Sequence, residues 1–407
     1  MNTAHGTASA AFDHHSPAFA ANPYPIWAEL RTTEGPVSWS DAWGGFWVIT
    51  GHQECQQVMK DWETFSSADG IHIPRIPGVK HQVPIETDPP DYFVIKKVLA
   101  PWFSARSIKE YEDDIRQLVD ELIDQVIEAG SADAINDFAG PLPARFILRI
   151  LGFDESRWFP FREGAQAALG YAAPEVVKEK VGWVYEMVDD AIRSRRTGRA
   201  GREDIICRLL DTYFEGIVVN DELVTDILIL LLIAGLDTTT SLISHLMFSL
   251  TKEPGLRERL IADPALIPAA VEESLRHDAV VQTIARRAKR DTEIAGTKIS
   301  KGDMVLVGFG SASRDPSVFP DPDDFRVDRT NPSQNMGFGA GIHRCIGAPL
   351  ARLETRIAIE QLLKRMPDVR VPDGVTPQRY PDSAQVYQFR SLPIEFTPGR
   401  RYGAASS

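Results

Sequence analysis

The sequence predicts a mainly α-helical protein with a small β region, and three features support this prediction. The longest pattern is a helix from residue 221 to about 250, in which the stretch from Ile227 to Leu236 carries no charge and is apolar on every face. Such a helix passes through a protein interior, and the apolar stretch is shorter than the roughly 20 residues that span a bilayer. Further helical patterns lie at residues 53–61, 108–129, 143–151, 174–195 and 268–276. Strand patterns are short, at residues 46–49 and in a hairpin that joins 292–294 to 302–307.

The composition is typical of a globular protein, with 43% hydrophobic and 25% charged residues among 407. Length alone favours two or three domains. The formal net charge of −13 argues against broad binding to nucleic acid or to anionic membranes. Cys55, Cys207 and Cys345 form neither a paired framework nor a C-x-x-C motif, which favours a reduced, cytoplasmic setting.

The first 21 residues are rich in Ala, Ser, His and Thr, which predicts a flexible tail over 1–21 and a folded domain over 22–407. No Lys or Arg precedes Arg31 and no apolar run is unbroken. Neither a secretory signal nor a membrane anchor is therefore expected. The folded domain begins with a short helical pattern through Trp27 and Leu30.

Residues 66–90 lose all periodicity and collect Pro and Gly, which predicts a long surface loop. Loops of this length in a compact protein are usually functional or disordered. Arg75 and His81 in this loop either recognise a polar group on a ligand or are simply exposed charges.

The long helix changes character at Asp237, which three threonines follow. An acid and hydroxyl groups inside a buried helix are costly unless they are hydrogen-bonded. In a structural interpretation, each Thr bonds back to the carbonyl four residues earlier and Asp237 pairs with a buried Arg. In a functional interpretation, Asp237 and Thr238 take part in chemistry.

The run from Phe338 to Gly347, F-G-A-G-I-H-R-C-I-G, surrounds Cys345 with glycines directly before a helical pattern. Glycines let a backbone turn tightly and approach a flat ligand. Backbone N–H groups and the positive end of the following helix stabilise a thiolate. The alternative is a glycine-rich turn around a buried structural cysteine, and the unbroken pattern F-G-x-G-x-H-x-C-x-G argues against it.

This decapeptide resembles the haem-binding loop of the cytochromes P-450, the haem-thiolate monooxygenases. Residues 234–239, A-G-L-D-T-T, are similar to the family's oxygen-activating signature. The resemblance extends from about Tyr24 to the C-terminal region, looks like that of a bacterial, soluble member, and implies one domain. It also implies haem b between the long helix and the Cys345 loop, with Cys345 as the axial iron ligand and dioxygen as co-substrate.

The resemblance implies specific roles around the haem. Thr238 is expected to hydrogen-bond dioxygen and Asp237 to pass protons towards it, with a local widening of the helix at Gly235. Other expected haem contacts are Ala234, Gly235, Phe338, Gly339 and Gly347.

Four residues are expected to bind the haem propionates. Arg286 and His343 align with propionate-binding residues of the family. Where the family often has E-T-D-P-P-x-H followed by an Arg, this chain has Tyr92 and Lys96. A phenol donates one hydrogen bond and an ammonium group supplies a point charge, but the bidentate fork of Arg is lost.

Glu273 and Arg276 form an E-x-x-R in a helical pattern. Alone this is weak, because i,i+3 ion pairs on helix surfaces are common and contribute only a few tenths of a kcal/mol. The resemblance implies that Arg329, from a later segment, joins them in a buried network that fixes the fold around the thiolate loop.

The substrate pocket is expected to be largely apolar and to hold a small or medium hydrophobic molecule. Its predicted lining residues are Ile71, Ile73, Val83, Ile233, Gln282, Thr283, Ile284 and Tyr387.

The leading hypothesis is a monooxygenase that receives electrons from a separate ferredoxin and its reductase. The partner is expected near a basic patch, composed of Lys96, Lys97, Arg344, Arg352 and Arg356. A peroxide-driven peroxygenase is the first alternative, although peroxygenases of the family usually lack the acid and alcohol that Asp237 and Thr238 provide. A non-catalytic haem sensor is the second, and it needs only the thiolate loop.

Overall fold

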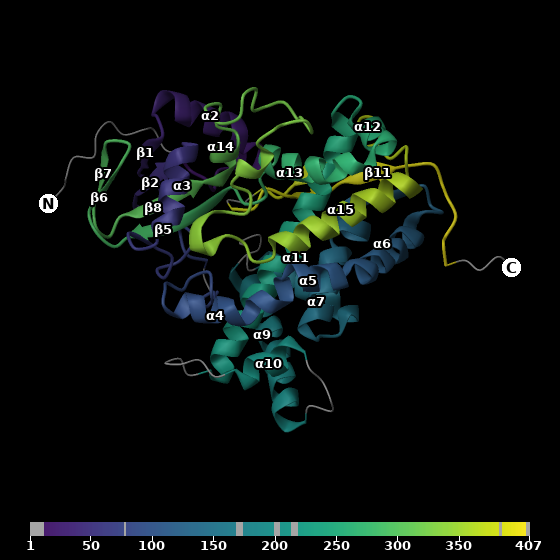
Figure 1. The fold of residues 1–407 in the computed structure, drawn as a ribbon, viewed down its shortest axis with the longest axis horizontal. Coiled ribbons are helices and arrows are strands. Elements are labelled where there is room, and N and C mark those ends of the chain that lie inside the picture. Colours follow the sequence, from purple (N-terminus) through teal and green to yellow (C-terminus); the bar gives the residue numbers. More distant parts are fainter. Residues whose placement is uncertain are drawn as a thin grey trace.

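The structure, a computed structural model, describes residues 12–76, 79–167, 174–198, 204–212, 219–381 and 385–403. Over these residues the chain forms a helical body with a small β region (Figure 1), which confirms the predicted fold class. The longer helices are α2 (Pro23–Thr33), α3 (His52–Lys60), α4 (Asp91–Leu99), α6 (Glu112–Val126), α7 (Pro141–Leu151), α8 (Trp158–Gln166), α9 (Pro174–Thr197), α11 (Asp221–Lys252), α13 (Ile267–His277) and α15 (Ala348–Arg365). The shorter helices are α1 (Pro17–Ala21), α5 (Ala105–Glu110), α10 (Ile205–Asp211), α12 (Leu256–Ala262) and α14 (Phe309–Ser313).

The central element is α11, which runs through the middle of the helical body (Figure 1) and packs against α7, α8, α9, α13 and α15. It begins after Asn220, whose side chain accepts a hydrogen bond from the Leu223 N–H, and Asp221 and Glu222 follow in its first turn. Both features stabilise a helix start. Of the helices in the described residues, it alone is long and apolar enough to cross a membrane, but 83% of its apolar window is buried inside the fold. It is therefore a core helix.

Strands from distant parts of the chain form a five-stranded sheet in the order β1-β2-β8-β5-β3. Its strands are β1 (Val37–Ser40), β2 (Phe46–Ile49), β8 (Met304–Gly308), β5 (Thr283–Ala288) and β3 (Phe65–Ser66). β2 pairs parallel with β8, and β5 pairs antiparallel with β8, with Ile284 opposite Val307. One face of the sheet packs in a buried cluster that includes Ile71, Ile284 and Phe309. Smaller two-stranded pairs are β4 (Ser131–Asp133) with β11 (Pro393–Glu395), and β9 (Gln378–Arg379) with β10 (Phe389–Ser391).

The predicted hairpin is wrong in its second strand. β6 (Thr292–Ile294) pairs with β7 (Thr297–Ile299), and Ala295 and Gly296 between them have φ angles of 48° and 80°. Two consecutive residues with positive φ make the tight turn that suits a hairpin. The strand predicted at residues 302–307 instead becomes β8, between β2 and β5.

The prediction of a flexible tail is wrong for residues 12–21. Residues Pro17–Ala21 form α1, and the Phe12 and Phe19 side chains are buried. Both rings pack against Trp27 of α2, with ring centroids 5.1 and 5.2 Å apart. Burial of aromatic area therefore fixes this segment to the body, whereas residues 1–11 lie outside the described residues.

Candidate functional site

A cavity of about 250 Å³ lies between α11 and the glycine-rich loop of Cys345. Cys345 lines it from the loop, and Ala234 and Thr238 line it from α11. Most of its other walls are apolar and include Leu230, Leu231, Ile233, Leu242, Leu275, Val280, Ile284, Phe309 and Val386. A mostly apolar cavity with a few convergent polar groups is typical of a small-molecule site.

The loop of Cys345 places the sulfur at the cavity wall and directs N–H groups at it. The Cys345 N–H donates to the Phe338 carbonyl at 3.0 Å, which closes the loop. The backbone N–H groups of Gly347 and Ala348, at the start of α15, donate to the sulfur. Burial of the sulfur in the surrounding protein raises the pKa of the Cys345 thiol. These N–H groups and the nearby Arg352 guanidinium oppose this effect. The loop thus provides the donors that a thiolate requires.

Gly341 shows why this loop requires glycine. Its φ is 68°, and a Cβ at this position would lie 2.0 Å from the Met59 carbonyl oxygen. Phe338 and Gly339 line the cavity on the same loop. The Phe338 ring lies under the Arg352 guanidinium, 4.5 Å from its centroid, so the loop is packed against both α3 and α15.

Beside the cavity, the buried guanidinium group of Arg286 lies near the partly buried, neutral ring of His343. The Arg286 side chain donates from Nη1 to the Ala285 carbonyl at 2.7 Å, and its buried Nη2 has no partner among the described residues. Burial lowers the pKa of Arg286 to about 10, against the opposing effect of Asp88. Burial also lowers the pKa of His343 to about 3, and the charge of Arg286 adds to this effect. An uncompensated buried cation is costly, so an anionic group would pair with Arg286.

Tyr92 and Lys96 lie one turn apart on α4, on the same face of the helix. Both line the cavity and both donate to the Ile342 carbonyl, Lys96 from Nζ at 2.6 Å. The Tyr92 ring also contacts the His343 ring, with centroids 4.3 Å apart. The pair therefore holds the Cys345 loop and stands next to His343.

On α11, the acid and the alcohol point in different directions. Thr238 Oγ1 donates to the Ala234 carbonyl at 2.7 Å while Thr238 lines the cavity. Asp237 is fully buried, and its Oδ1 lies 3.4 Å from Arg162 Nε of α8. Its Oδ2 has no partner among the described residues. Burial raises the pKa of the Asp237 carboxyl, although Arg162 opposes this. The hydrogen bonds are those of the structural interpretation, yet the Thr238 hydroxyl remains at the cavity wall.

The expected widening at Gly235 is not seen. α11 remains a regular helix through this stretch. Gly235 lies against α7, where a Cβ would be 3.2 Å from Ile147 Cγ1. The missing side chain thus permits close helix packing, and Ala234 is the neighbour that faces the cavity.

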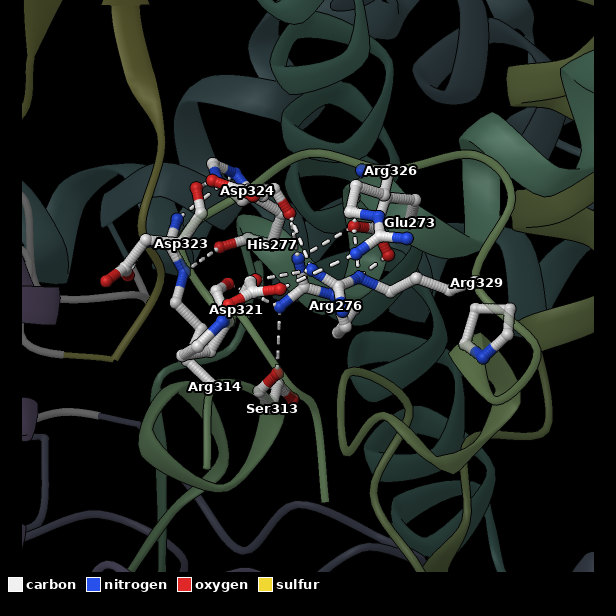
Figure 2. Close-up of polar contacts among 12 residues, drawn as sticks. Glu273, Arg276, His277, Ser313, Arg314, Asp321, Asp323, Asp324, Arg326 and Arg329 are labelled. Atoms are coloured by element: carbon white, nitrogen blue, oxygen red, sulfur yellow. Dashed lines mark hydrogen bonds and ion pairs between the residues drawn. The ribbon is translucent and has the colours of Figure 1, made fainter. Parts of the chain in front are cut away.

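The predicted E-x-x-R network is fully assembled (Figure 2). Arg276 donates from Nε and Nη2 to the two carboxylate oxygens of Glu273, at 2.8 and 2.7 Å. Arg329 Nε donates to Glu273 Oε1 at 2.9 Å. The guanidinium groups also donate to backbone carbonyls of the segment between α14 and the Cys345 loop, those of Pro320, Asp321, Pro322 and Asp324. Glu273 therefore ties α13 to the segment that leads into the loop.

Of the predicted pocket residues, Ile71, Ile233 and Ile284 line the cavity. The other five lie elsewhere in the described structure. Ile73 and Tyr387 belong to the cluster around the N-terminal segment, and Val83 packs in the main helical core. Thr283 lies in β5, where its partner is Gly308.

The Gln282 side chain is hydrogen-bonded to residues in the N-terminal part of the chain. It accepts from Trp27 Nε1 at 3.0 Å and donates to Tyr24 OH at 3.2 Å and to the Ala279 carbonyl at 2.6 Å. Its side chain therefore has partners on each polar atom and does not face the cavity.

The polar residues of the cavity wall that sequence reasoning missed include His72 and Gln82. Both lie in the loop of residues 66–90, where no periodicity tells which side chains point inward. The only signal was the length of the loop itself.

Comparison with known proteins supports one family. A sequence profile described as Cytochrome P450 matches residues 172–388. The chain is 33% identical over 386 residues to the putative cytochrome P450 YjiB of Bacillus subtilis (strain 168), which covers 92% of this chain and 94% of that protein. It is 33% identical over 404 residues to the cytochrome P450 monooxygenase PikC of Streptomyces venezuelae, covering 95% and 94%.

A solved structure is similar over nearly its whole length. The crystal structure of CYP109E1 from Bacillus megaterium in complex with testosterone superposes with a TM-score of 0.84 at 30% sequence identity. The alignment covers 94% of this chain and 99% of that chain.

Proposed function

The chain belongs to the cytochrome P450 family of oxygen-incorporating oxidoreductases, and from this premise we propose that it inserts one oxygen atom from dioxygen into a small or medium, largely hydrophobic substrate. The observation that carries the proposal is the position of Cys345. Its sulfur faces an apolar cavity whose wall on α11 carries Ala234 and Thr238. Two backbone N–H groups favour the thiolate form of that sulfur and oppose the effect of burial, which raises its pKa.

The residues around the cavity fit haem b. Cys345 would bind the iron through its sulfur, and Arg286 with His343 would hold the haem carboxylates, supported by Tyr92 and Lys96. The buried Nη2 of Arg286, which has no partner among the described residues, supports this assignment, because a carboxylate is an anion that pairs with a guanidinium group. Bound haem with a thiolate ligand supplies the activation of dioxygen.

The chain's own residues exclude water and handle protons. The apolar walls hold the substrate and keep bulk water from the reacting side. Thr238 presents its hydroxyl at the cavity wall, and it holds or passes a proton there. Asp237 lies behind it with a raised pKa, and its Oδ2 has no partner in the described part of the chain, so its carboxyl is able to take up a proton and return it.

The test is a spectrum together with an isotope experiment. The reduced, carbon-monoxide-bound holoprotein is expected to show thiolate ligation, and Cys345→Ser is expected to lose it. Apolar compounds that shift the haem absorption band serve as substrates in turnover under labelled dioxygen. One labelled oxygen atom in the product supports the proposal, whereas product formed only with hydrogen peroxide would point to a peroxygenase.

For electron supply, we infer a separate ferredoxin with its reductase in the cytoplasm. Of the expected basic patch, Arg352 pairs with Glu272, and Arg356 pairs with Glu112 and Glu360. Their charges are therefore largely compensated.

Lys97 and Arg344 are exposed and have no ion-pair partner in the described part of the chain, so docking centres on these two. Rising salt is expected to slow ferredoxin-dependent reduction. The double variant Lys97→Gln with Arg344→Gln should flatten that salt dependence, and an unchanged dependence would contradict this docking site.

A further inference from the structure

His72 and Gln82 are the two polar side chains that the loop of residues 66–90 places in the cavity wall, and the function above uses neither. We propose that they form a recognition site for a neutral hydroxyl group on an otherwise apolar substrate. This names the substrate class of the monooxygenase and rests on that function.

The hydrogen bond between the two side chains fixes what they offer to a ligand. Gln82 Nε2 lies 3.3 Å from His72 Nε2. An amide nitrogen only donates, so His72 Nε2 accepts and the neutral ring carries its proton on Nδ1. Burial lowers the pKa of His72 to about 4, and the neighbouring His15 and Arg75 add to the effect, so the ring is neutral near pH 7.

One donor and one acceptor remain at the site. Within the described residues, His72 Nδ1 and Gln82 Oε1 take part in no other hydrogen bond. A hydroxyl group satisfies both, because it accepts from one partner and donates to the other. A hydrocarbon leaves both groups unpaired at a desolvated wall, which costs binding free energy.

The carboxylate of Glu86 holds the loop that carries His72 and Gln82. Glu86 is 2% exposed and accepts from the backbone N–H of Ile71 at 3.2 Å and of Gln82 at 2.9 Å. Arg75 Nη2 also donates to it, at 3.3 Å. Glu86 therefore fixes the backbone next to His72 and at Gln82 itself.

The N-terminal segment holds the same loop from the other side of His72. His14 and His15 each place Nε2 against the Ile73 carbonyl oxygen, at 2.7 and 2.8 Å. His72 thus stands between two anchored residues, Ile71 and Ile73. Such preorganisation lowers the entropic cost of ligand binding.

The site disfavours a negatively charged group on the substrate. His72 is neutral, and Arg75, the guanidinium whose charge acts on His72, is already paired with Glu86. A carboxylate at this wall would lose its hydration without gaining a cation. The substrate is therefore expected to carry a hydroxyl rather than an acid at this end.

The experiment measures equilibrium binding to the haem-loaded protein by calorimetry. The probes are decalin, adamantane and androstane, each compared with its mono-alcohol and its monocarboxylic acid. For at least one skeleton, the preference for the alcohol over the hydrocarbon should be roughly tenfold to hundredfold larger in the native protein than in the double variant His72→Phe with Gln82→Leu. Because the ratio is compared between two proteins, differences in probe hydration cancel.

The control is Asp69→Asn, which alters an exposed polar side chain of the same loop that does not line the cavity. It should keep the preference for the alcohol. Equal preferences in native and double-variant protein for every skeleton, or tighter binding of the acids than of the alcohols, would overturn the inference.

Binding here needs neither dioxygen nor electrons, so the outcome is separate from that of the proposed function. An inactive holoprotein with the alcohol preference would refute only the function. An active one without the preference would refute only the recognition site. A thiolate-type spectrum of each carbon-monoxide-bound variant checks that the haem site is intact.

Discussion

Arg286 carries a buried charge whose effects on stability and on cofactor binding have opposite signs. Its Nη2 is buried and has no hydrogen-bond partner within the described ranges, which costs about 1–3 kcal/mol. In Arg286→Met, the free energy of unfolding of the haem-free protein should rise by about that amount. The affinity for haem should fall at least about tenfold, because a charge-assisted bond to a carboxylate is lost. Urea unfolding and haem titration measure the two quantities.

Arg287→Met is the control for this variant. Arg287 is the next residue in β5 and pairs with Asp69 at 3.1 Å on a half-exposed surface. It should leave haem affinity unchanged and alter stability by less than about 1 kcal/mol. Lower stability together with unchanged haem affinity in Arg286→Met would contradict the role of Arg286 as the carboxylate partner.

Residues inside compact motifs were predictable, and residues of the long loop were not. Thr238 reaches the cavity because α11 fixes its direction, and Cys345 because the bond from its N–H to the Phe338 carbonyl closes its loop. In residues 66–90 the direction depends on Glu86, whose carboxylate binds the backbone N–H of Ile71 at the other end of the loop and that of Gln82. No local pattern encodes that bond. Ile71 therefore faces the cavity while Ile73, two residues on, packs on the N-terminal segment.

At the scale of elements, the carboxylate of Glu273 connects α13 to the segment before the Cys345 loop. Glu273→Gln leaves the Arg276 and Arg329 guanidinium groups without their buried counter-charge. Breaking a buried ion pair on one side costs about 3–5 kcal/mol. The free energy of unfolding of the holoprotein, measured in urea, should fall by this amount.

The neighbouring Glu272 provides a matched control on the same helix. It pairs with Arg352 at a partly exposed site, so Glu272→Gln should cost less than about 1 kcal/mol. Equal losses from both variants would show that the Glu273 network behaves as an ordinary surface ion pair.

Elements with a strong local signal matched their predicted bounds. The strand at residues 46–49 is β2, and the long helix ends two residues beyond its predicted limit. α8 escaped prediction because Pro160 and Gly164 interrupt its helical pattern. The partner of β6 was predicted wrongly because the chain turns back at residues 295–296. The strand that pairs with β6 is therefore β7, directly after this turn, and not the later strand at residues 302–307.

At the scale of the whole molecule, the chain length predicted two or three domains. This prediction was wrong because a single helix contributes to the main hydrophobic core and contacts most of its other helices. α11 is buried along most of its length and packs on five other long helices. Its apolar side chains join the main hydrophobic cluster, which also takes in residues from α6, α7, α13 and α15. Over the described residues, the two smaller clusters lie around the five-stranded sheet and the N-terminal segment, and neither is as large as the main one. The sequence showed this only through the all-apolar stretch of that helix.

Acid should destabilise the whole fold through buried neutral histidines. Burial lowers the pKa values of His14, His72 and His245 to about 4 each. In the unfolded chain these residues protonate near pH 6.5. Between these values the unfolded state binds more protons than the folded state, so the free energy of unfolding falls as pH falls. Each histidine contributes at most about 1.4 kcal/mol per pH unit.

A variant of His245 measures the contribution of one of these histidines to the pH dependence. His245 Nδ1 lies 3.1 Å from the Asp278 carbonyl, and its Nε2 lies 3.4 Å from the Arg379 guanidinium, whose charge also lowers the pKa of His245. His245→Gln keeps an amide donor but does not titrate. Urea unfolding of the haem-free protein between pH 7 and pH 4.5 should give a shallower loss of stability in this variant, by about one proton. An identical slope in both proteins would show that His245 is already charged in the fold, and Asp278 and Arg379 would then need a different arrangement around it.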